Sequence, residues 1–323
     1  MLNTAEKTLK TAVHSVKGID RQTAVQMSER KGAEIYELFT LSNRVREKFR
    51  GNKVDLCSII NAKSGACPED CSFCAQSAKS KTNIDVHPLI NREKVLKAAK
   101  SAKAYGARRF CIVTSGMKPS GRELGEICSF ISEVRDIGLL PCATLGMLGK
   151  EQLAQLKDAG LYRYHHNLET SEAFFSEICT THTYREKIRT IEAATSRGLS
   201  VCSGGIFGLG ETWEDRIDMA FAIKELNIES VPINFLTPVN GTPLGHSELL
   251  RPLDALKIIA IYRLILPDRE IRICGGRPQT LRDLNSYIFF AGADGLLIGN
   301  YLTTRGKRPE EDLQMIGDMG LEI

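Results

Sequence analysis

The chain has 323 residues, of which 42% are hydrophobic and 25% are charged, and its formal net charge is +4. These values are ordinary for a globular protein and allow either two domains or one α/β barrel with a substantial core. No apolar run approaches the roughly 18 residues that a membrane-spanning helix needs, and the polar stretch 1–30 lacks the apolar core of a signal peptide.

The ten cysteines are more than packing requires in a chain that we expect to be cytoplasmic. In a reducing compartment, such a number indicates metal or redox chemistry rather than disulfides. The basic stretch 92–103 alternates with apolar residues at helical spacing, which favours a solvated helix face over a nucleic-acid patch. We therefore expect neither a membrane nor a nucleic acid among the partners.

From residue 54 onward, short apolar and β-branched segments alternate with helical ones. The predicted strands are Val54–Asn61, Arg109–Thr114, Leu140–Leu145, Arg163–Glu169, Ser200–Phe207, Ser230–Leu236, Glu270–Gly275 and Gly295–Gly299. Apolar residues at 3–4 spacing predict helices at Arg92–Tyr105, Leu148–Ala159, Trp213–Leu226 and Leu253–Leu266. Eight strands alternating with helices predict an α/β fold, a (β/α)8 TIM-type barrel, in preference to a doubly wound sheet. We expect residues 1–50 to form a helical extension packed outside a barrel that spans 51–323 with a C-terminal extension.

Three cysteines, Cys67, Cys71 and Cys74, follow the first predicted strand with C-x3-C-x2-C spacing. Loops after barrel strands are where active sites gather. Three thiolates in eight residues can hold one compact soft metal centre, and a 4Fe–4S cluster held by three ligands leaves one iron open. A zinc site is the alternative, but zinc favours a closed set of four ligands, and no matching cysteine pair follows nearby.

The string GACPEDCSFCAQS at residues 65–77 closely resembles biotin synthases, a family of the radical S-adenosylmethionine (SAM) superfamily. The resemblance continues through Val201–Glu211, Ser230–Asn234 and Leu302–Thr304 and covers about residues 50–310. It implies that the triad holds a 4Fe–4S cluster whose open iron chelates SAM. One electron from a small electron-transfer protein then yields a radical that removes hydrogen from dethiobiotin. The family inserts one sulfur to form biotin, the last step of biotin biosynthesis, and suggests a homodimer.

Polar residues alternate along the fourth predicted strand, where one face carries His165, Asn167 and Glu169. Polar groups inside a barrel are costly unless they bind something, so the pattern favours ligand binding. The resemblance implies that Asn167 and Glu169 hold the ribose hydroxyls of SAM. The commoner form has Asn at the place of His165, contacting the ureido ring of the substrate, and Asp at the place of Glu169.

Other matches to the family extend the predicted cofactor and substrate contacts. Phe73 resembles an aromatic residue near the adenine, and Ile206, in a glycine-rich segment, resembles a residue packed on it. Asn234 resembles a second contact to the ureido ring. Thr303 and Thr304 resemble the hydroxyls that hold the substrate carboxylate, although a plain polar loop explains these two threonines equally well.

Four further cysteines and one arginine point to an auxiliary cluster. The family places Cys111, Cys142 and Cys202 around a 2Fe–2S cluster, completed in its common form by an arginine that matches Arg272. Here Cys274 shares one face of the seventh predicted strand with Arg272, where the common form has serine. We predict that Cys274 is the fourth ligand of a 2Fe–2S or four-iron cluster, with Arg272 adjacent or as the alternative ligand. The remaining cysteines, Cys57, Cys128 and Cys179, are predicted to serve packing.

Two rival functions remain open from the sequence. The first is another radical SAM enzyme of the same subgroup, such as a hydrogenase-cofactor maturase or a methylornithine-type mutase; the matches at Asn234, Thr303 and Thr304 argue against it. The second is a non-enzymatic iron–sulfur carrier, which would need neither an open iron nor a SAM site.

Overall fold

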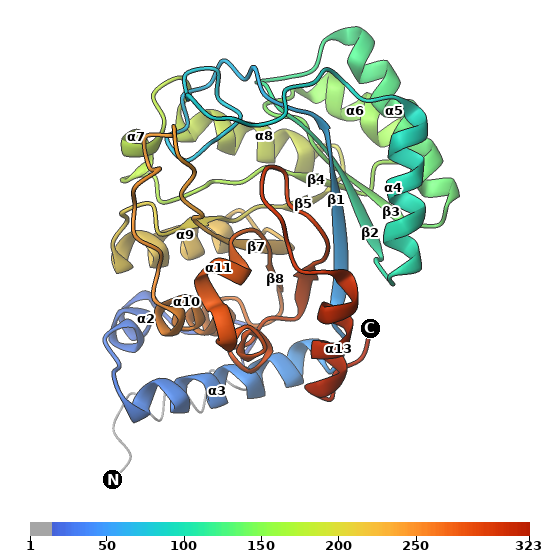
Figure 1. Cartoon of the computed structure of the whole chain (residues 1–323). Helices are drawn as coiled ribbons and strands as arrows, with labels where there is room; N and C mark the ends of the chain where they lie inside the picture. Colours follow the sequence, from blue (N-terminus) through green and yellow to red (C-terminus); the bar gives the residue numbers. More distant parts are fainter. Residues whose placement is uncertain (1–14) are drawn as a thin grey trace.

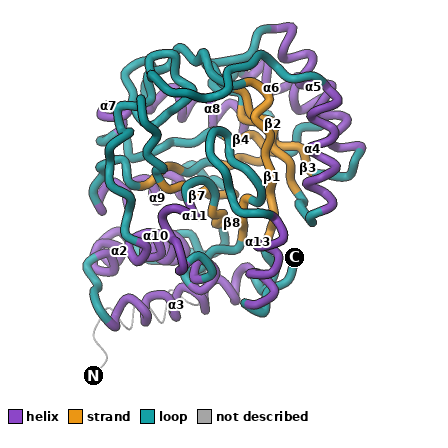
Figure 2. Tube along the Cα trace, in the orientation of Figure 1, coloured by secondary structure: helices purple, strands orange, loops and turns teal. Residues whose placement is uncertain are grey.

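The computed structural model describes residues 15–323, and this range contains nine parallel strands. They are β1 (Asp55–Lys63), β2 (Arg109–Thr114), β3 (Leu140–Thr144), β4 (Arg163–His165), β5 (Ser200–Cys202), β6 (Gly205–Phe207), β7 (Ser230–Phe235), β8 (Glu270–Ile273) and β9 (Gly295–Leu297). The sheet runs from β5 through β1 and β9 to β6, and β5 also pairs with β7, which closes the barrel. Figure 1 and Figure 2 show this barrel inside a layer of helices. The predicted (β/α)8 fold is confirmed.

One predicted strand is divided in the structure. The segment predicted as Ser200–Phe207 forms β5 and β6, separated by Ser203 and Gly204. At this break the backbone lies against β7: Ser203 N donates to Ser230 O at 3.0 Å, and a Cβ on Gly204 would lie 2.0 Å from Pro232 O. Glycine permits such close backbone approach. Eight predicted strand positions are therefore filled by nine strands.

Helices pack around the barrel. They are α2 (Arg21–Ser28), α3 (Ala33–Arg50), α4 (Arg92–Ala104), α5 (Gly121–Asp136), α6 (Lys150–Asp158), α7 (Phe175–Ile178), α8 (Tyr184–Ser196), α9 (Trp213–Glu225), α10 (Pro252–Ile265), α11 (Arg277–Leu281), α12 (Tyr287–Phe290) and α13 (Pro309–Asp318). The four predicted helices match α4, α6, α9 and α10, with ends within two residues. No helix in the described range is long and apolar enough to cross a membrane.

The N-terminal helices α2 and α3 lie outside the barrel, as predicted. Apolar residues of α3 recur at helical spacing, and Ile35, Leu38, Phe39 and Val45 are buried. This face packs against α10, while α2 packs against α9 and α10 (Figure 1). Residues 1–14 lie outside the described range, and the predicted domain boundary near residue 50 stays a prediction.

A buried ion pair fixes the C-terminal helix α13 to the body of the barrel. The Arg277 Nη2 atom of α11 donates to both oxygens of Asp312, at 3.0 and 2.9 Å, and neither side chain is exposed. Asn285 Oδ1 accepts a further hydrogen bond from Arg277 at 3.1 Å. A buried charge of this kind is strongly destabilising when its partner is removed.

We therefore expect Asp312→Ala to lower the free energy of unfolding by about 3–5 kcal/mol, because it leaves the Arg277 guanidinium buried without its counter-charge. Urea denaturation of the full chain measures this loss. Asp318→Ala on the exposed side of the same helix is the control and should change stability by less than about 0.5 kcal/mol. Equal stability of the two variants would contradict the importance of the buried pair.

Candidate active site

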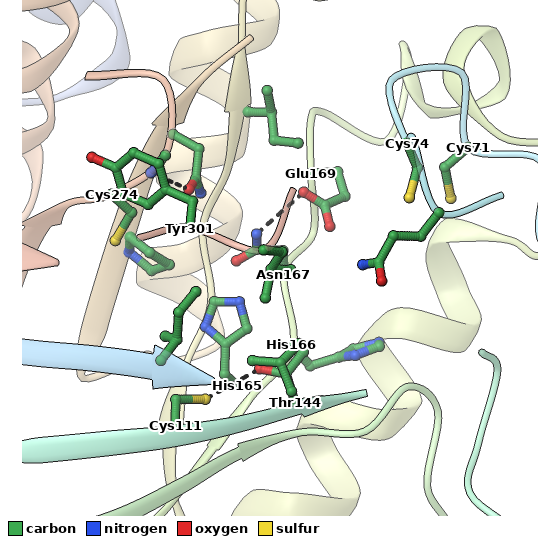
Figure 3. Close-up of a pocket in the computed structure, with 18 of the residues that line it drawn as sticks. Cys71, Cys74, Cys111, Thr144, His165, His166, Asn167, Glu169, Cys274 and Tyr301 are labelled. Atoms are coloured by element: carbon green, nitrogen blue, oxygen red, sulfur yellow. Dashed lines mark hydrogen bonds between the residues drawn. The ribbon is translucent and has the colours of Figure 1, made fainter. Parts of the chain in front are cut away.

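A cavity of about 440 Å³ opens at the C-terminal ends of the barrel strands. Its volume lies within the usual range for small-molecule sites. It is lined by every residue that the sequence assigned to a site: Cys67, Cys71, Phe73, Cys74, Cys111, Cys142, His165, Asn167, Glu169, Cys202, Ile206, Asn234, Arg272, Cys274, Thr303 and Thr304. In Figure 3, Cys71 and Cys74 lie on one side, Cys111 and Cys274 on the other, and Asn167 and Glu169 between them.

The cysteine triad lies in the loop that follows β1. Backbone hydrogen bonds hold this loop in place: Cys67 N donates to Gln76 O at 3.1 Å, and Ala78 N donates to Cys67 O at 2.8 Å. A further bond from Cys74 N to Cys71 O, at 3.0 Å, tightens the turn between the last two cysteines. All three thiols are partly exposed. Three soft sulfur donors on one short loop match the donor set of an iron–sulfur cluster with an open site.

The polar residues after β4 are presented by a turn rather than by a strand. The predicted strand Arg163–Glu169 ends at His165, because the following backbone bonds to the β5–β6 break; Leu168 N and Glu169 N both donate to Gly204 O. Glu169 adopts a φ of 74°, which is strained for a residue with a side chain. Strain of this kind often marks functional sites, and here it accompanies a carboxylate that lines the cavity.

Hydrogen bonds fix the side chains of this turn. Asn167 Nδ2 donates to Glu169 Oε2 at 3.2 Å, and Asn167 Oδ1 accepts from Gly204 N at 3.1 Å. A Cβ on Gly205 would lie 2.3 Å from Glu169 O, so that only glycine allows the two segments to meet. The amide and the carboxylate are therefore held together at the middle of the cavity wall.

Asn234, near the end of β7, links the neighbouring strands. Its Nδ2 donates to Gly205 O at 3.1 Å, and its Oδ1 accepts from Gly275 N at 2.9 Å. One N–H and one lone pair of the amide stay available to a ligand. The aromatic and aliphatic walls come from Phe73 and Ile206, both half-buried, and the loop after β9 carries the two threonines.

Buried thiols line the deep part of the cavity. Cys111 of β2 and Cys142 of β3 are direct register partners, and Cys202 is paired with His165 of β4. Cys274 directly follows β8 and packs with Cys57 of β1. Burial, followed by the neighbouring Cys142 and Cys57 thiols, raises the pKa of Cys111 well above its usual value. The thiols are thus near enough to influence one another electrostatically.

Cys202 differs from the other deep thiols in its electrostatic surroundings. Burial alone would raise its pKa, but the His165 ring and the Arg163 guanidinium outweigh burial and lower the pKa of Cys202 to about 7. Its Sγ also donates to Ser230 Oγ at 3.5 Å. This thiol is therefore the readiest of the deep set to become the thiolate that binds metals.

Below the thiols, a ring of charged side chains closes the N-terminal end of the barrel. Arg163 binds Glu270 at 2.6 Å, and Arg109 binds both Asp55 and Glu270. Arg272 donates through Nη2 to Asp55 Oδ1 at 2.5 Å and through Nη1 to Asp55 O at 2.9 Å. Three nearly buried guanidinium groups thus face the largely buried carboxylates of Asp55 and Glu270, and the more exposed Glu229 lies 3.7 Å from Arg163.

Comparison with known proteins identifies the family. The model of the radical SAM superfamily matches residues 62–223, and that of the biotin and thiamin synthesis associated domain matches residues 232–322. The biotin synthase of Thermodesulfovibrio yellowstonii is 52% identical over 291 residues, 90% of this chain and 92% of that protein. That of Geobacter sulfurreducens is 50% identical over 307 residues, 94% and 93% of the two chains. This chain belongs to the biotin synthase family.

Membership makes the chain an enzyme of the radical SAM class, which implies a 4Fe–4S cluster and SAM as cofactors. Solved structures share the fold of this biotin synthase family member at low identity. Methylornithine synthase has a TM-score of 0.82 at 18% identity and covers 98% of this chain and 96% of its own. The FeFe-hydrogenase maturase HydG from Carboxydothermus hydrogenoformans has a TM-score of 0.81 at 16% identity. This match covers 98% of this chain and 79% of that protein. Both rival enzyme classes therefore share the barrel, whereas the sequence similarity favours biotin synthase.

Some residues of this family member lie at the cavity without having been predicted there. Cys57 was predicted to serve packing, yet it lines the cavity beside Cys274. The sequence could have indicated this position, because Cys57 and Ile59 alternate along β1 and therefore share one face, which lines the cavity. Tyr301, two residues before Thr303, also lines the cavity, and its buried hydroxyl faces the Arg277 guanidinium. Cys179, also predicted as packing, lies 3.9 Å from Cys71, sulfur to sulfur.

The charged ring should make stability depend on pH. Burial alone would raise the pKa of Glu270, but Arg163, Arg272 and Arg109 outweigh it and lower the pKa from 4.5 to about 2. The contribution of this lowered pKa to the free energy of unfolding is fully present above pH 4.5. It is lost as the pH falls towards 2.

We expect the wild type to lose about 2 kcal/mol more than Glu270→Gln in free energy of unfolding between pH 5 and pH 3, because the variant lacks the titrating carboxylate. Urea denaturation at both pH values measures the difference. Glu192→Gln, at an exposed position of α8, is the control and should follow the wild type. The same pH dependence in wild type and Glu270→Gln would show that the Glu270 carboxylate does not cause the pH dependence of stability.

Proposed function

We propose that this chain converts dethiobiotin to biotin, inserting one sulfur atom between two carbons. The sulfur comes from an auxiliary iron–sulfur cluster held by the deep thiols. The observation that carries the proposal is the single cavity that joins the triad loop to those thiols. A substrate between the two sets of sulfur atoms would face a radical source on one side and a sulfur source on the other.

The triad Cys67, Cys71 and Cys74 is the proposed ligand set of the 4Fe–4S cluster that binds SAM. When bound, the cluster and SAM supply a carbon radical able to remove hydrogen from an unactivated C–H bond. The chain's own part is to position the cofactors and to exclude water, for which the buried walls in the deep part of the cavity are suited.

The turn after β4 is the proposed SAM ribose site. Asn167 and Glu169 are held together at 3.2 Å, and a carboxylate beside an amide offers acceptors and donors to a pair of hydroxyls. Phe73 and Ile206 supply apolar surface on the same cavity for an adenine. The glycines at 204 and 205 let the backbone lie close to this ligand.

His165 and Asn234 are the proposed contacts of the substrate's ureido ring. Asn234 keeps one N–H and one lone pair free, while each nitrogen of the His165 ring can donate or accept but not both. Thr303 and Thr304 are proposed to hold the carboxylate tail, because they lie at the rim of the same cavity on the loop after β9.

Cys111, Cys142, Cys202 and Cys274 are the proposed ligands of the auxiliary cluster, whether it has two irons or four. Arg272 is the weaker candidate because Asp55 and Glu270 already hold its guanidinium. Those carboxylates raise the pKa of Arg272 further although burial alone would lower it, so the group stays protonated and lacks the lone pair a metal needs. The guanidinium groups of Arg163 and Arg272 would also favour the thiolate forms of Cys202 and Cys274 above them.

The remaining proposals rest on the family resemblance. They are reduction by a small electron-transfer protein, assembly as a homodimer and a cytoplasmic location. Ten cysteines, all free, suit a reducing compartment.

Loss of the triad should abolish the reaction. We expect Cys67→Ala/Cys71→Ala/Cys74→Ala to form no 5′-deoxyadenosine from SAM under reductant, and no biotin from dethiobiotin, because no ligands hold the cluster. Anaerobic incubation followed by mass spectrometry measures both products. Cys128→Ala, at a half-exposed cysteine on α5, is the matched control and should retain both. Normal SAM cleavage by the triple variant would overturn the proposed function.

The fourth ligand of the auxiliary cluster is tested separately. We expect Cys274→Ser to bind less iron and sulfide and to change the Mössbauer spectrum of the auxiliary cluster, since a hydroxyl is a poor substitute for a soft thiolate. Cys57→Ser is the matched control, because both cysteines are 7% exposed on the same wall. An unchanged iron count and spectrum in Cys274→Ser would exclude it as a ligand. Loss in Cys57→Ser instead would assign the role to Cys57.

A further inference from the structure

Two cysteines from distant segments of the chain meet at the cavity mouth. Cys71 lies in the triad loop and is partly exposed, whereas Cys179 directly follows α7 and is buried. Their Sγ atoms are 3.9 Å apart. The proposed reaction uses Cys71 as a cluster ligand and gives no role to Cys179.

The backbone segments around the two cysteines run antiparallel. On one side of the pair, Ser72 N donates to Ile178 O at 2.9 Å. On the other side, the Asp70 carboxylate accepts a hydrogen bond from Thr180 N at 2.9 Å. Residue numbers therefore fall along one segment as they rise along the other, which places the two cysteines directly opposite each other. Cys179 also has extended backbone angles, with φ −157° and ψ 134°.

This arrangement suits a disulfide between the two side chains. Residues directly opposite each other on antiparallel extended segments have Cα atoms about 4.5–5.5 Å apart. Disulfides span Cα separations of about 4.4–6.8 Å, with the two sulfur atoms about 2.05 Å apart. Rotation of the two side chains from their present separation would therefore form the bond without movement of the backbone.

Polar side chains hold the Cys179 sulfur in this position. Its Sγ donates to Asp70 Oδ1 at 3.3 Å and lies 3.3 Å from His182 Nδ1. Glu69 Oε2 lies 2.5 Å from the same ring nitrogen, and the Phe175 ring packs edge-on against His182 with 5.6 Å between centroids. A cysteine that only fills space behaves as a small hydrophobic residue and needs none of these contacts. The sulfur is thus kept beside the triad loop.

We propose that Cys71 and Cys179 form a reversible disulfide in the cluster-free chain, by exchange with a low-molecular-weight disulfide of the glutathione class. Cys71, the more exposed of the two, attacks one sulfur of the small disulfide as a thiolate, which forms a mixed disulfide and releases one small thiol. Cys179 then attacks the Cys71 sulfur, which forms the protein disulfide and releases the second small thiol. Two electrons pass from the protein thiols to the small disulfide, and the two thiol protons end on the released thiols.

The disulfide withdraws one of the three proposed ligands of the SAM-binding cluster, a step that rests on the proposed function. Cluster binding and the Cys71–Cys179 bond therefore exclude each other. An exposed thiolate is open to oxidation to sulfinic and sulfonic acids, which are mostly irreversible, whereas a thiol reductant returns a disulfide to its thiols. The bond thus keeps Cys71 in a recoverable form until a cluster is available.

Peptide mapping tests the pairing. The full chain carrying Cys67→Ala/Cys74→Ala is prepared anaerobically without clusters, incubated with glutathione disulfide, alkylated and digested with trypsin. In this variant the tryptic peptides 64–79 and 164–185 each contain one cysteine of the proposed pair and no other. We expect mass spectrometry to recover the two peptides linked to each other, and to recover them separately after treatment with dithiothreitol.

A further variant tests the second step of the exchange. Cys67→Ala/Cys74→Ala/Cys179→Ala keeps only the first reacting thiol, so we expect glutathione to stay bound to peptide 64–79, whereas the double variant should lose it. Cys128→Ala, made in the background of the double variant, is the matched control and should give the linked peptides in unchanged yield. Circular dichroism checks folding, and Cys179→Ser replaces the alanine substitution if the latter unfolds the chain.

Three results would overturn the inference. The first is the absence of linked peptides in Cys67→Ala/Cys74→Ala. The second is equally fast loss of glutathione when Cys179 is also removed, which would show that another thiol completes the exchange. The third is recovery of the linked peptides from the cluster-loaded wild type at unchanged iron content. The first two are read on chains without clusters and do not bear on SAM cleavage by the loaded enzyme, so failure there is distinguishable from failure of the proposed function.

Discussion

Three arginines buried at the N-terminal end of the barrel are paired with two largely buried carboxylates, Asp55 and Glu270, and one of them, Arg163, also with the more exposed Glu229. A buried guanidinium without such a partner is strongly destabilising, so these five side chains must be placed together when the strands close. The ring closes one end of the cavity and holds the Arg272 guanidinium on Asp55 and Glu270. It also places guanidinium groups beneath the thiols proposed to bind a cluster.

The groups that line the cavity follow a fixed order along the barrel axis. The charged ring stands at the N-terminal ends of the strands, and the buried thiols lie above it. Asn167 and Glu169 lie between Cys111 and Cys274 on one side and Cys71 and Cys74 of the triad loop on the other (Figure 3). Parallel strands make this order possible, because all their C-terminal ends meet at one end of the barrel. A substrate between mouth and floor would contact residues from several different strands.

The break between β5 and β6 contributes both to the closure of the barrel and to the shape of the site. The break between β5 and β6 lets β5 pair with β7, and the same break accepts the backbone of the turn that carries Asn167 and Glu169. The strained φ of Glu169 is maintained by these contacts. A side chain at Gly204 or Gly205 would therefore disturb both the sheet and the proposed SAM site.

Period and spacing are local properties of a chain, and they determined the alternating strands and helices, the barrel they predict, the cysteine triad and the polar face at residues 165–169. The family resemblance supplied the other site residues that share the cavity. The sequence did not determine where β4 ends or that one strand is divided, since backbone contacts between distant segments decide both. It also assigned Cys57 and Cys179 to packing. Only tertiary structure decided that Cys57 lies beside Cys274 and Cys179 beside Cys71, because contacts across 217 and 108 positions leave no periodic pattern in the sequence.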